Sequence, residues 1–188
     1  MPQLPPSPWA LKDWAAVCAA LLRGKQTLLL RKGGIAEEPE GLRFDHSSFW
    51  VFPTQFHQNS EALQPSARDW TPVAQSWAES PGRLMLPVFL QSVAVRQICS
   101  LDQLAPFAAW HVLSPATVEQ RFLYRQPGLW LVLVRAYEPA VPLILENPDQ
   151  YGGCKSWVRL PEPHEPLHPR VIVGDEQFAD MQREFLAE

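Results

Sequence analysis

The sequence predicts a single-domain α+β protein in which a mixed, mainly antiparallel sheet is flanked by an N-terminal and a C-terminal helix. Helix-type and strand-type patterns follow one another irregularly, with no βαβ period and no internal repeat. Of the 188 residues, 46% are hydrophobic and 11% are aromatic, which is enough for a folded core. Prolines crowd both ends, before residue 9 and between residues 161 and 169. We therefore expect an extended arm (1–8), the α+β domain (9–160) and a C-terminal part (161–188) with a proline-rich connector, a short strand and an acidic helix.

Near its start the chain shows a helical pattern. Ser7 and Pro8 are a typical cap and first turn, apolar residues recur at helical spacing from Leu11 to Leu22, and Gly24 can end the helix. We therefore predict a helix that begins at about residue 9.

The remaining elements are indicated by apolar runs, turn residues and caps. Strands are expected at residues 26–31, 48–52, 88–99, 129–137, 155–160 and 170–173. Helices are expected at residues 100–112, where Ser100 and Gln103 have capping-box spacing, at residues 114–125, and from Asp175 onward. Residues 53–83 have little periodicity and predict irregular structure anchored by aromatic side chains.

Composition excludes several classes of protein. The chain carries 16 Lys and Arg against 20 Asp and Glu, a net charge of −4. Its longest apolar runs, residues 15–22 and 129–134, are too short to cross a bilayer, so no membrane association is expected. Three widely spaced cysteines and a start unlike a signal peptide favour the cytoplasm. The sequence identifies no cofactor and no metal site.

The first candidate site is the turn after the strand at residues 26–31. It contains Arg31, Lys32, Gly33 and Gly34, and no acidic residue occurs between Asp13 and Glu37. Successive glycines can turn backbone N–H groups toward an anion, and the two cations add attraction. The turn therefore predicts a phosphate site, with an ordinary hairpin turn as the alternative.

The second candidate site lies around the strand at residues 48–52. His46, Thr54, His57 and Gln58 are polar side chains outside its two ends, and His57 is a candidate general base. Two histidines without a third ligand do not indicate a metal site. The alternative is that these side chains bond the ends of the strand.

The third candidate site is a glycine turn with reactive side chains. Gly153, Cys154, Lys155, Ser156 and Trp157 follow one another directly. Lys155 favours the reactive thiolate of Cys154 if this thiol is exposed, which makes Cys154 a candidate nucleophile. The alternative is a buried, inert cysteine and a lysine that contacts an anion.

Three segments together resemble a bacterial family known as domain of unknown function 1802. They are LLLRKGGI at residues 28–35, FWVFPT with the following HQ at residues 49–58, and YGGCKSW at residues 151–157. The resemblance covers residues 11–160, with the acidic tail peripheral to it, and implies association with nucleases that use an acidic residue two positions before a lysine. None of the four lysines has an acidic residue at that spacing: Ala10, Arg23, Leu30 and Gly153 precede Lys12, Lys25, Lys32 and Lys155. The chain would thus be a recognition half beside a nuclease-type partner.

Three functions remain open. The first is a binding module for phosphate-bearing ligands, nucleic acid or nucleotide, in which the cationic turn holds phosphate and Trp50 or Trp157 stacks on a base. The second is a hydrolase or transferase that uses His57 with the turn at residues 154–156. The third is a protein-interaction domain in which all these motifs are structural.

Overall fold

The computed structural model describes residues 4–33, 35–38, 41–55, 60–70, 77, 82–146, 151, 153 and 155–187, with the backbone alone for residues 35–38 and 41–43. The strands are β1 (Ser7–Trp14), β2 (Leu28–Arg31), β3 (Ile35–Glu38), β4 (Gly41–Phe44), β5 (Ser48–Thr54), β6 (Arg83–Leu86), β7 (Phe89–Ile98), β8 (Leu129–Glu138), β9 (Leu143–Glu146), β10 (Trp157–His164) and β11 (Arg170–Val171). The α-helices are α1 (Ala15–Leu22), α3 (Pro115–Leu123) and α4 (Asp175–Ala187), and the 3-10 helices are η1 (Ser60–Ala62), η2 (Pro65–Trp70) and η3 (Leu101–Trp110).

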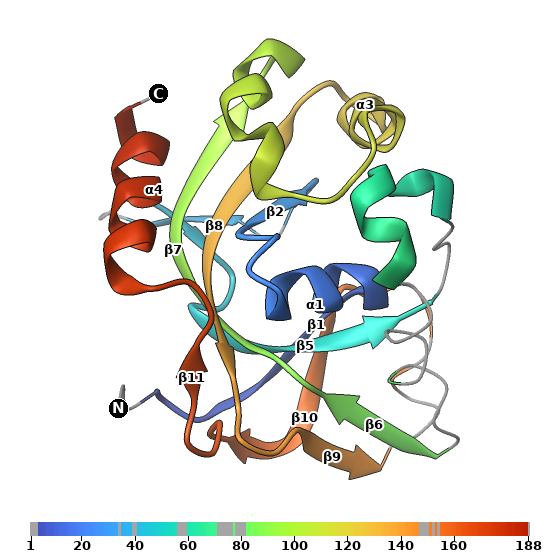
Figure 1. Cartoon of the computed structure of the whole chain (residues 1–188), viewed down its shortest axis with the longest axis vertical. Helices are drawn as coiled ribbons and strands as arrows, with labels where there is room; N and C mark the ends of the chain where they lie inside the picture. Colours follow the sequence, from blue (N-terminus) through green and yellow to red (C-terminus); the bar gives the residue numbers. More distant parts are fainter. Residues whose placement is uncertain are drawn as a thin grey trace.

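A seven-stranded sheet organises the fold (Figure 1). Its order is β10-β1-β5-β7-β8-β11, and β2 also pairs with β8. Among the described strand pairs, β1 with β5 is parallel and the others are antiparallel. Helix α1 follows the first strand and α4 ends the described chain, so the predicted α+β class with a mainly antiparallel sheet is confirmed.

The N-terminal helix prediction is wrong for its first half. Residues 7–14 form β1, which pairs with both β5 and β10, and the helix begins only at Ala15. Ala10 and Leu11 are both fully buried but belong to different core clusters, as neighbours on a strand must. Sheet partners on both sides override the local helical spacing, and Pro8, which has no N–H, lies where the pairing with β10 is irregular.

Both faces of the central strands are buried. Leu11, Phe49 and Val51 join the larger core cluster, which includes side chains of α1, η3 and α4. Ala10 and Trp50 join a smaller cluster that includes residues of β6. Because both of its faces are covered, β5 has a nearly continuous apolar run from Phe49 to Pro53 rather than an alternating pattern.

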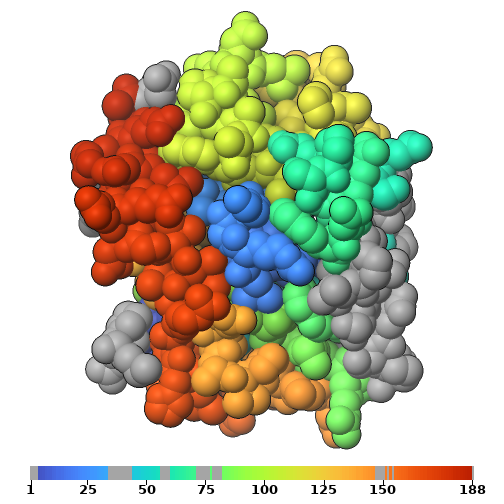
Figure 2. Space-filling model, in the orientation of Figure 1, coloured from blue at the N-terminus to red at the C-terminus, as the bar shows by residue number. Residues whose placement is uncertain are grey.

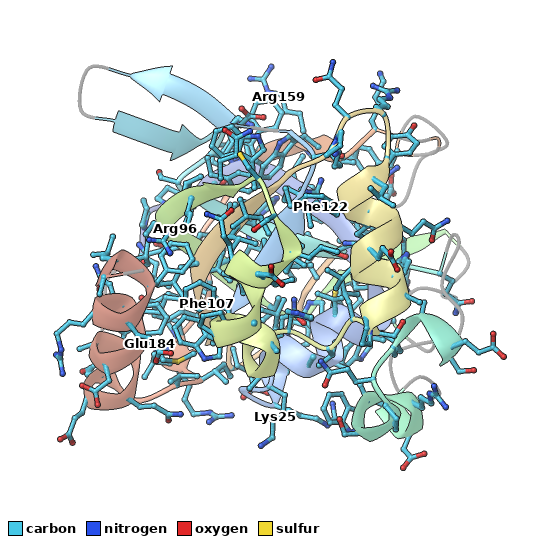
Figure 3. The ribbon with its side chains drawn as sticks, turned by 90° about the horizontal axis from the view of Figure 1, so that it is seen from above. Lys25, Arg96, Phe107, Phe122, Arg159 and Glu184 are labelled. Atoms are coloured by element: carbon cyan, nitrogen blue, oxygen red, sulfur yellow. The ribbon has the colours of Figure 1, made fainter. Side chains whose placement is uncertain are left out.

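The helices pack on the larger cluster. Helix α1 is apolar on all sides. In Figure 2 the blue segment that contains α1 is surrounded by η2, η3 and α4. Phe107 of η3 points toward α4, where its ring lies 5.4 Å from that of Phe185 (Figure 3). The predicted Ser100 and Gln103 cap is confirmed, but Pro106 lies inside the helix, which has 3-10 rather than α geometry.

The C-terminal residues share this core. Strand β10 continues through Pro161 to His164, where a connector was expected, and prolines are tolerated there because β10 is an edge strand. The predicted short strand and final helix are present as β11 and α4. Phe178 and Phe185 of α4 are buried in the larger cluster.

Candidate functional site

A pocket of about 470 Å³ lies where several strands begin or end. Because β1 and β5 are parallel, their carboxyl ends meet, and Trp14 is the register partner of Thr54. Strand β10 is antiparallel to β1, so its start lies at the same place, and the Lys12 N–H donates to the Ser156 carbonyl at 2.8 Å. The pocket is lined by Lys12, Asp13, Trp14, Leu30, Arg31, Lys32, Gly33, Asp45, Thr54, Arg121, Ser156 and Trp157.

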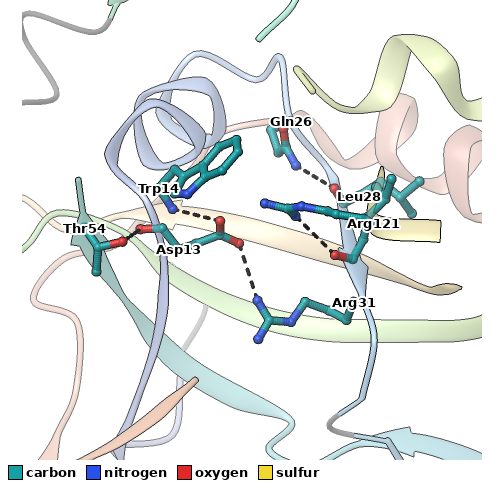
Figure 4. Close-up of polar contacts among 8 residues, drawn as sticks. Asp13, Trp14, Gln26, Leu28, Arg31, Thr54 and Arg121 are labelled. Atoms are coloured by element: carbon teal, nitrogen blue, oxygen red, sulfur yellow. Dashed lines mark hydrogen bonds and ion pairs between the residues drawn. The ribbon is translucent and has the colours of Figure 1, made fainter. Parts of the chain in front are cut away.

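At the floor of this pocket, a carboxylate lies between two arginines (Figure 4). Asp13 at the end of β1 has a side chain only 8% exposed, and Arg31 at the end of β2 approaches it to 3.9 Å. The carboxylate also accepts the Trp14 N–H at 2.8 Å, while the Asp13 carbonyl accepts the Thr54 hydroxyl at 3.1 Å. These bonds fix Asp13 and through it the direction of the Arg31 guanidinium.

Arg121 reaches the same place from α3. Its guanidinium lies 4.8 Å from the Trp14 ring centre and donates to the Leu30 carbonyl at 3.4 Å. Burial lowers the pKa of Arg121, nearby Asp13 opposes this effect, and Arg31 adds to it. Arginine stays charged at neutral pH, so two cations face one recessed anion.

The two lysines of the pocket are held by backbone carbonyls. Lys12 donates to the carbonyls of Tyr151 and Gly153. Lys32 donates to Phe122, Gln126 and Gly128, all in or just after α3. Carbonyls do not neutralise an ammonium, so the Lys32 charge remains, but the Lys32 ammonium binds the wall of the pocket rather than its interior.

An aromatic cluster adjoins the pocket and contributes Trp157 to its lining. The Trp157 indole N–H donates to the Asp45 carboxylate at 3.1 Å, which fixes the ring. His46 meets the Trp157 ring edge to face and stacks on Trp9 at 4.1 Å between centroids. Burial lowers the pKa of His46, with Asp45 in part opposing it. His46 lines a neighbouring hollow that shares Asp45 with the main pocket.

The structure brings the three predicted motifs to one place. Six of the predicted site residues line the pocket: Arg31, Lys32, Gly33, Thr54, Ser156 and Trp157. His46 lines the adjoining hollow, Gly153 supplies a carbonyl to Lys12, and Lys155 is exposed outside the lining. Gly34, His57, Gln58 and Cys154 lie outside the described residues.

Two details differ from the sequence predictions. Gly33 lines the pocket, but its φ lies outside the left-handed region and a Cβ there would meet nothing within 4 Å, so it does not form the predicted left-handed turn. Trp50, considered for base stacking, is 1% exposed and its N–H donates to the His164 carbonyl, so it belongs to the core.

Sequence reasoning missed Lys12, Asp13, Trp14 and Arg121. The first three lie in the segment that the sequence pattern predicts to be a helix. Arg121 is one charged residue of an amphipathic helix and carries no distinguishing signal. The one local feature in the sequence is that Asp13 stands directly before Trp14 and the apolar run at residues 15–22, which does not by itself mark a site.

The pocket carries more positive than negative charge, although the whole chain has a net charge of −4. Its lining sets four cations against two carboxylates: Lys12, Arg31, Lys32 and Arg121 against Asp13 and Asp45. Among the described residues, no group of three or more His, Cys, Asp or Glu is arranged to hold a metal ion. Within the same residues, no helix is long and apolar enough to span a membrane.

The fold and the pocket define an α+β domain with a cationic, aromatic-walled site at the strand ends. The chain belongs to the family described as domain of unknown function 1802, whose family model matches residues 10–184. The match includes β10, β11 and most of α4, so the tail is part of the family domain rather than peripheral to it.

Solved structures of one protein are similar in fold. An ASCH protein from Zymomonas mobilis is 15% identical with a TM-score of 0.48, over 81% of this chain and 86% of that one. A serine-to-alanine variant of it is 14% identical, also with a TM-score of 0.48, over 84% and 91% of the two chains. Among curated proteins, none matches the chain. The family description names no nuclease, and the nuclease-type partner is not supported.

Proposed function

We propose that the pocket binds a phosphate-bearing ligand, a nucleotide or a segment of nucleic acid. The observation that carries the proposal is the placement of Arg31 and Arg121 around the recessed Asp13. Within the described residues, the closest carboxylate to the Arg31 guanidinium is that of Asp13, and 3.9 Å is too long for a tight hydrogen bond. Arg31 therefore keeps N–H groups for a ligand.

The shape of the guanidinium favours phosphate over a simple anion. A planar fork of N–H donors can bind two phosphate oxygens at once, which a lysine ammonium cannot do. Asp13 holds this fork at the floor of the pocket and is itself largely covered, so the excess positive charge faces the opening. A local positive field of this kind attracts an anion even to an acidic protein.

The size and the aromatic wall favour a nucleotide. A volume of about 470 Å³ is within the roughly 300–1,000 Å³ of small-ligand sites. Trp157 is fixed by Asp45, so its ring is oriented before a ligand arrives. A pre-oriented aromatic ring beside a phosphate site is the arrangement used to stack a base, which is worth about 1–3 kcal/mol.

The test is a calorimetric titration of the protein with uridine 5′-monophosphate and with an oligouridylate at low salt. We expect binding that weakens as salt rises. The Arg31→Gln variant should lose about 1.5–3 kcal/mol of binding free energy, the value of hydrogen bonds to a charged group, or roughly a 10- to 150-fold loss of affinity.

A matched control is Arg170→Gln. Arg170 undergoes the same chemical change, but it is an exposed residue of β11 paired with Glu138, and it does not line the pocket. The affinity of the Arg170→Gln variant for uridine 5′-monophosphate and for the oligouridylate should equal that of the unchanged protein. Absence of binding at low salt, or equal losses in the two variants, would refute the proposed function.

A further inference from the structure

A second hollow of about 400 Å³ adjoins the first pocket. It lies around the connection from α3 to β8 and is lined in part by Gln97, Tyr124, Arg125, Gln126 and Trp130. Lys32 lines both hollows. Arg31 of the first pocket is the cross-strand register partner of Trp130 of the second, and such partners lie about 5 Å apart. The two hollows are thus neighbours on one continuous surface.

The wall of the second hollow is a shaped loop. Arg125 has a φ of 63° and Gly128 a φ of 124°, both in the left-handed region that permits a tight reversal. The Lys32 ammonium binds the carbonyls of Phe122, Gln126 and Gly128 and so fixes this reversal to the end of β2. The same lysine that separates the two hollows therefore fixes their relative position.

The side chains here suit a nucleic acid base and its phosphate. Tyr124 is 57% exposed, which is unusual for an aromatic ring that has a folded core available. The Arg125 guanidinium lies 5.2 Å from its ring centre, so a cation and a stacking surface stand together. Gln97 and Gln126, both exposed, add amide donors and acceptors at the rim.

We infer that the ligand of the proposed function is a single-stranded nucleic acid that extends from the first pocket across Lys32 onto Tyr124 and Arg125. This inference rests on the proposed function. A mononucleotide held by Arg31 fills one hollow, whereas a strand offers the repeated phosphates and bases that both hollows can use. The strand must be single, because paired bases have no free faces to stack on a protein ring.

The experiment compares uridine 5′-monophosphate with an oligouridylate of about 8 nucleotides, within the roughly 4–16 that a single-strand-binding domain covers. Each is titrated into the unchanged protein, Tyr124→Ala and Arg31→Gln. We expect the oligouridylate to bind at least about tenfold more tightly than the mononucleotide. Tyr124→Ala should weaken oligouridylate binding about 5- to 150-fold and leave mononucleotide binding unchanged. Arg31→Gln should weaken both.

Two controls isolate the ring of Tyr124. Tyr124→Phe keeps the ring and should keep the affinity. Leu123→Ala removes a neighbouring side chain of the same 57% exposure that does not line the second hollow, and it should also change nothing. Circular dichroism of each variant checks that the fold is retained.

The outcomes separate the two proposals. Equal affinities for the mononucleotide and the oligouridylate, with no effect of Tyr124→Ala, would overturn the extended path and leave the proposed function standing. If neither the mononucleotide nor the oligouridylate bound at low salt, both the proposed function and the extended path would be overturned. Equal losses in Leu123→Ala and Tyr124→Ala would also overturn the stacking role.

Discussion

The Arg31 guanidinium lies 3.9 Å from the Asp13 carboxylate, although β2 and β1, which carry these residues, are not paired with each other. Strand β2 pairs with β8, while β1 pairs with β5 and β10. The ion pair therefore connects two parts of the sheet that backbone bonds do not join directly. It links the stability of the fold to the electrostatics of the pocket.

We expect Asp13→Asn to move stability and anion affinity in opposite directions. Loss of the carboxylate leaves Arg31 and Arg121 without their buried counter-charge, which should cost about 1–3 kcal/mol of folding free energy. The same change removes a negative charge from the pocket, so uridine 5′-monophosphate should bind more tightly. Urea unfolding and calorimetry measure the two effects.

A suitable comparison is Glu138→Gln, which removes the partner of Arg170 from an exposed pair. Exposed pairs contribute little, so its stability should change by less than about 1 kcal/mol and its ligand affinity should stay the same. Weaker anion binding by Asp13→Asn would contradict this prediction, and would mean that the orientation Asp13 gives to Arg31 matters more for affinity than the negative charge it adds to the pocket.

Lys32→Met should loosen the connection between α3 and β8. Three carbonyls lose a charged donor, at a cost of roughly 1.5–3 kcal/mol, and the reversal at Arg125 is no longer attached to β2. Trypsin should then cut after the exposed Arg125 faster than in the unchanged protein. The exposed Lys25, changed to Met, gives the reference rate, and equal rates in both variants would contradict this role of Lys32.

Acid should destabilise the fold through His111. Burial, with a smaller effect of Arg121, lowers the pKa of His111 to about 4, and its ring accepts the Leu113 N–H at 3.2 Å. The unfolded chain, with a His pKa of about 6.5, binds this proton first. Stability is therefore complete above pH 6.5 and falls by about 3 kcal/mol as the pH drops to about 4.

Urea unfolding between neutral pH and pH 4 checks this effect in the unchanged protein and in His111→Asn. The stability advantage of the unchanged protein should shrink as the pH falls. His168→Asn is the control, because His168 is exposed and its φ of 45° suits asparagine. A constant difference between His111→Asn and the unchanged protein over this range would disprove the assignment.

Two glycines should respond differently to alanine. Gly128 has a φ of 124°, and an added Cβ would lie 3.2 Å from the Ile98 carbonyl, so Gly128→Ala should cost about 1–3 kcal/mol. Gly33 is in an ordinary conformation with open space around it, so Gly33→Ala should change stability by less than about 0.5 kcal/mol. Thermal unfolding of both variants measures these changes in stability. A large loss of stability in Gly33→Ala would contradict the described conformation of this turn.

Strands with strong local signals were predictable, and so was part of the site. Strand β8 matches its apolar run, and the cap of η3 matches the spacing of Ser100 and Gln103. Arg31, Thr54 and Trp157, which belong to three separated motifs, line one pocket. Strand β8, the cap of η3 and each motif taken singly are determined by consecutive residues, which is the range over which propensity and turn chemistry act.

The missed features depend on distant partners. Residues 9–14 form a strand because β5 and β10 offer backbone bonds on both sides, and nothing within that segment records those partners. Asp13 is recognisable as a site residue only once Arg31 and Arg121 stand beside it. Tertiary contacts therefore override the local pattern in residues 9–14 and determine which side chains form the site.

Pairing of β1 with β10 has a consequence for how the protein forms. Ser7 pairs with His164, so β1, which is synthesised early, can pair with β10 only after β10 has been synthesised much later. Closing such a long loop is slow, and β1 stays without its edge partner until then. The pocket, which needs Lys12 beside Ser156, is complete only after this closure. A ligand can therefore stabilise the finished domain by mass action but cannot guide the early chain.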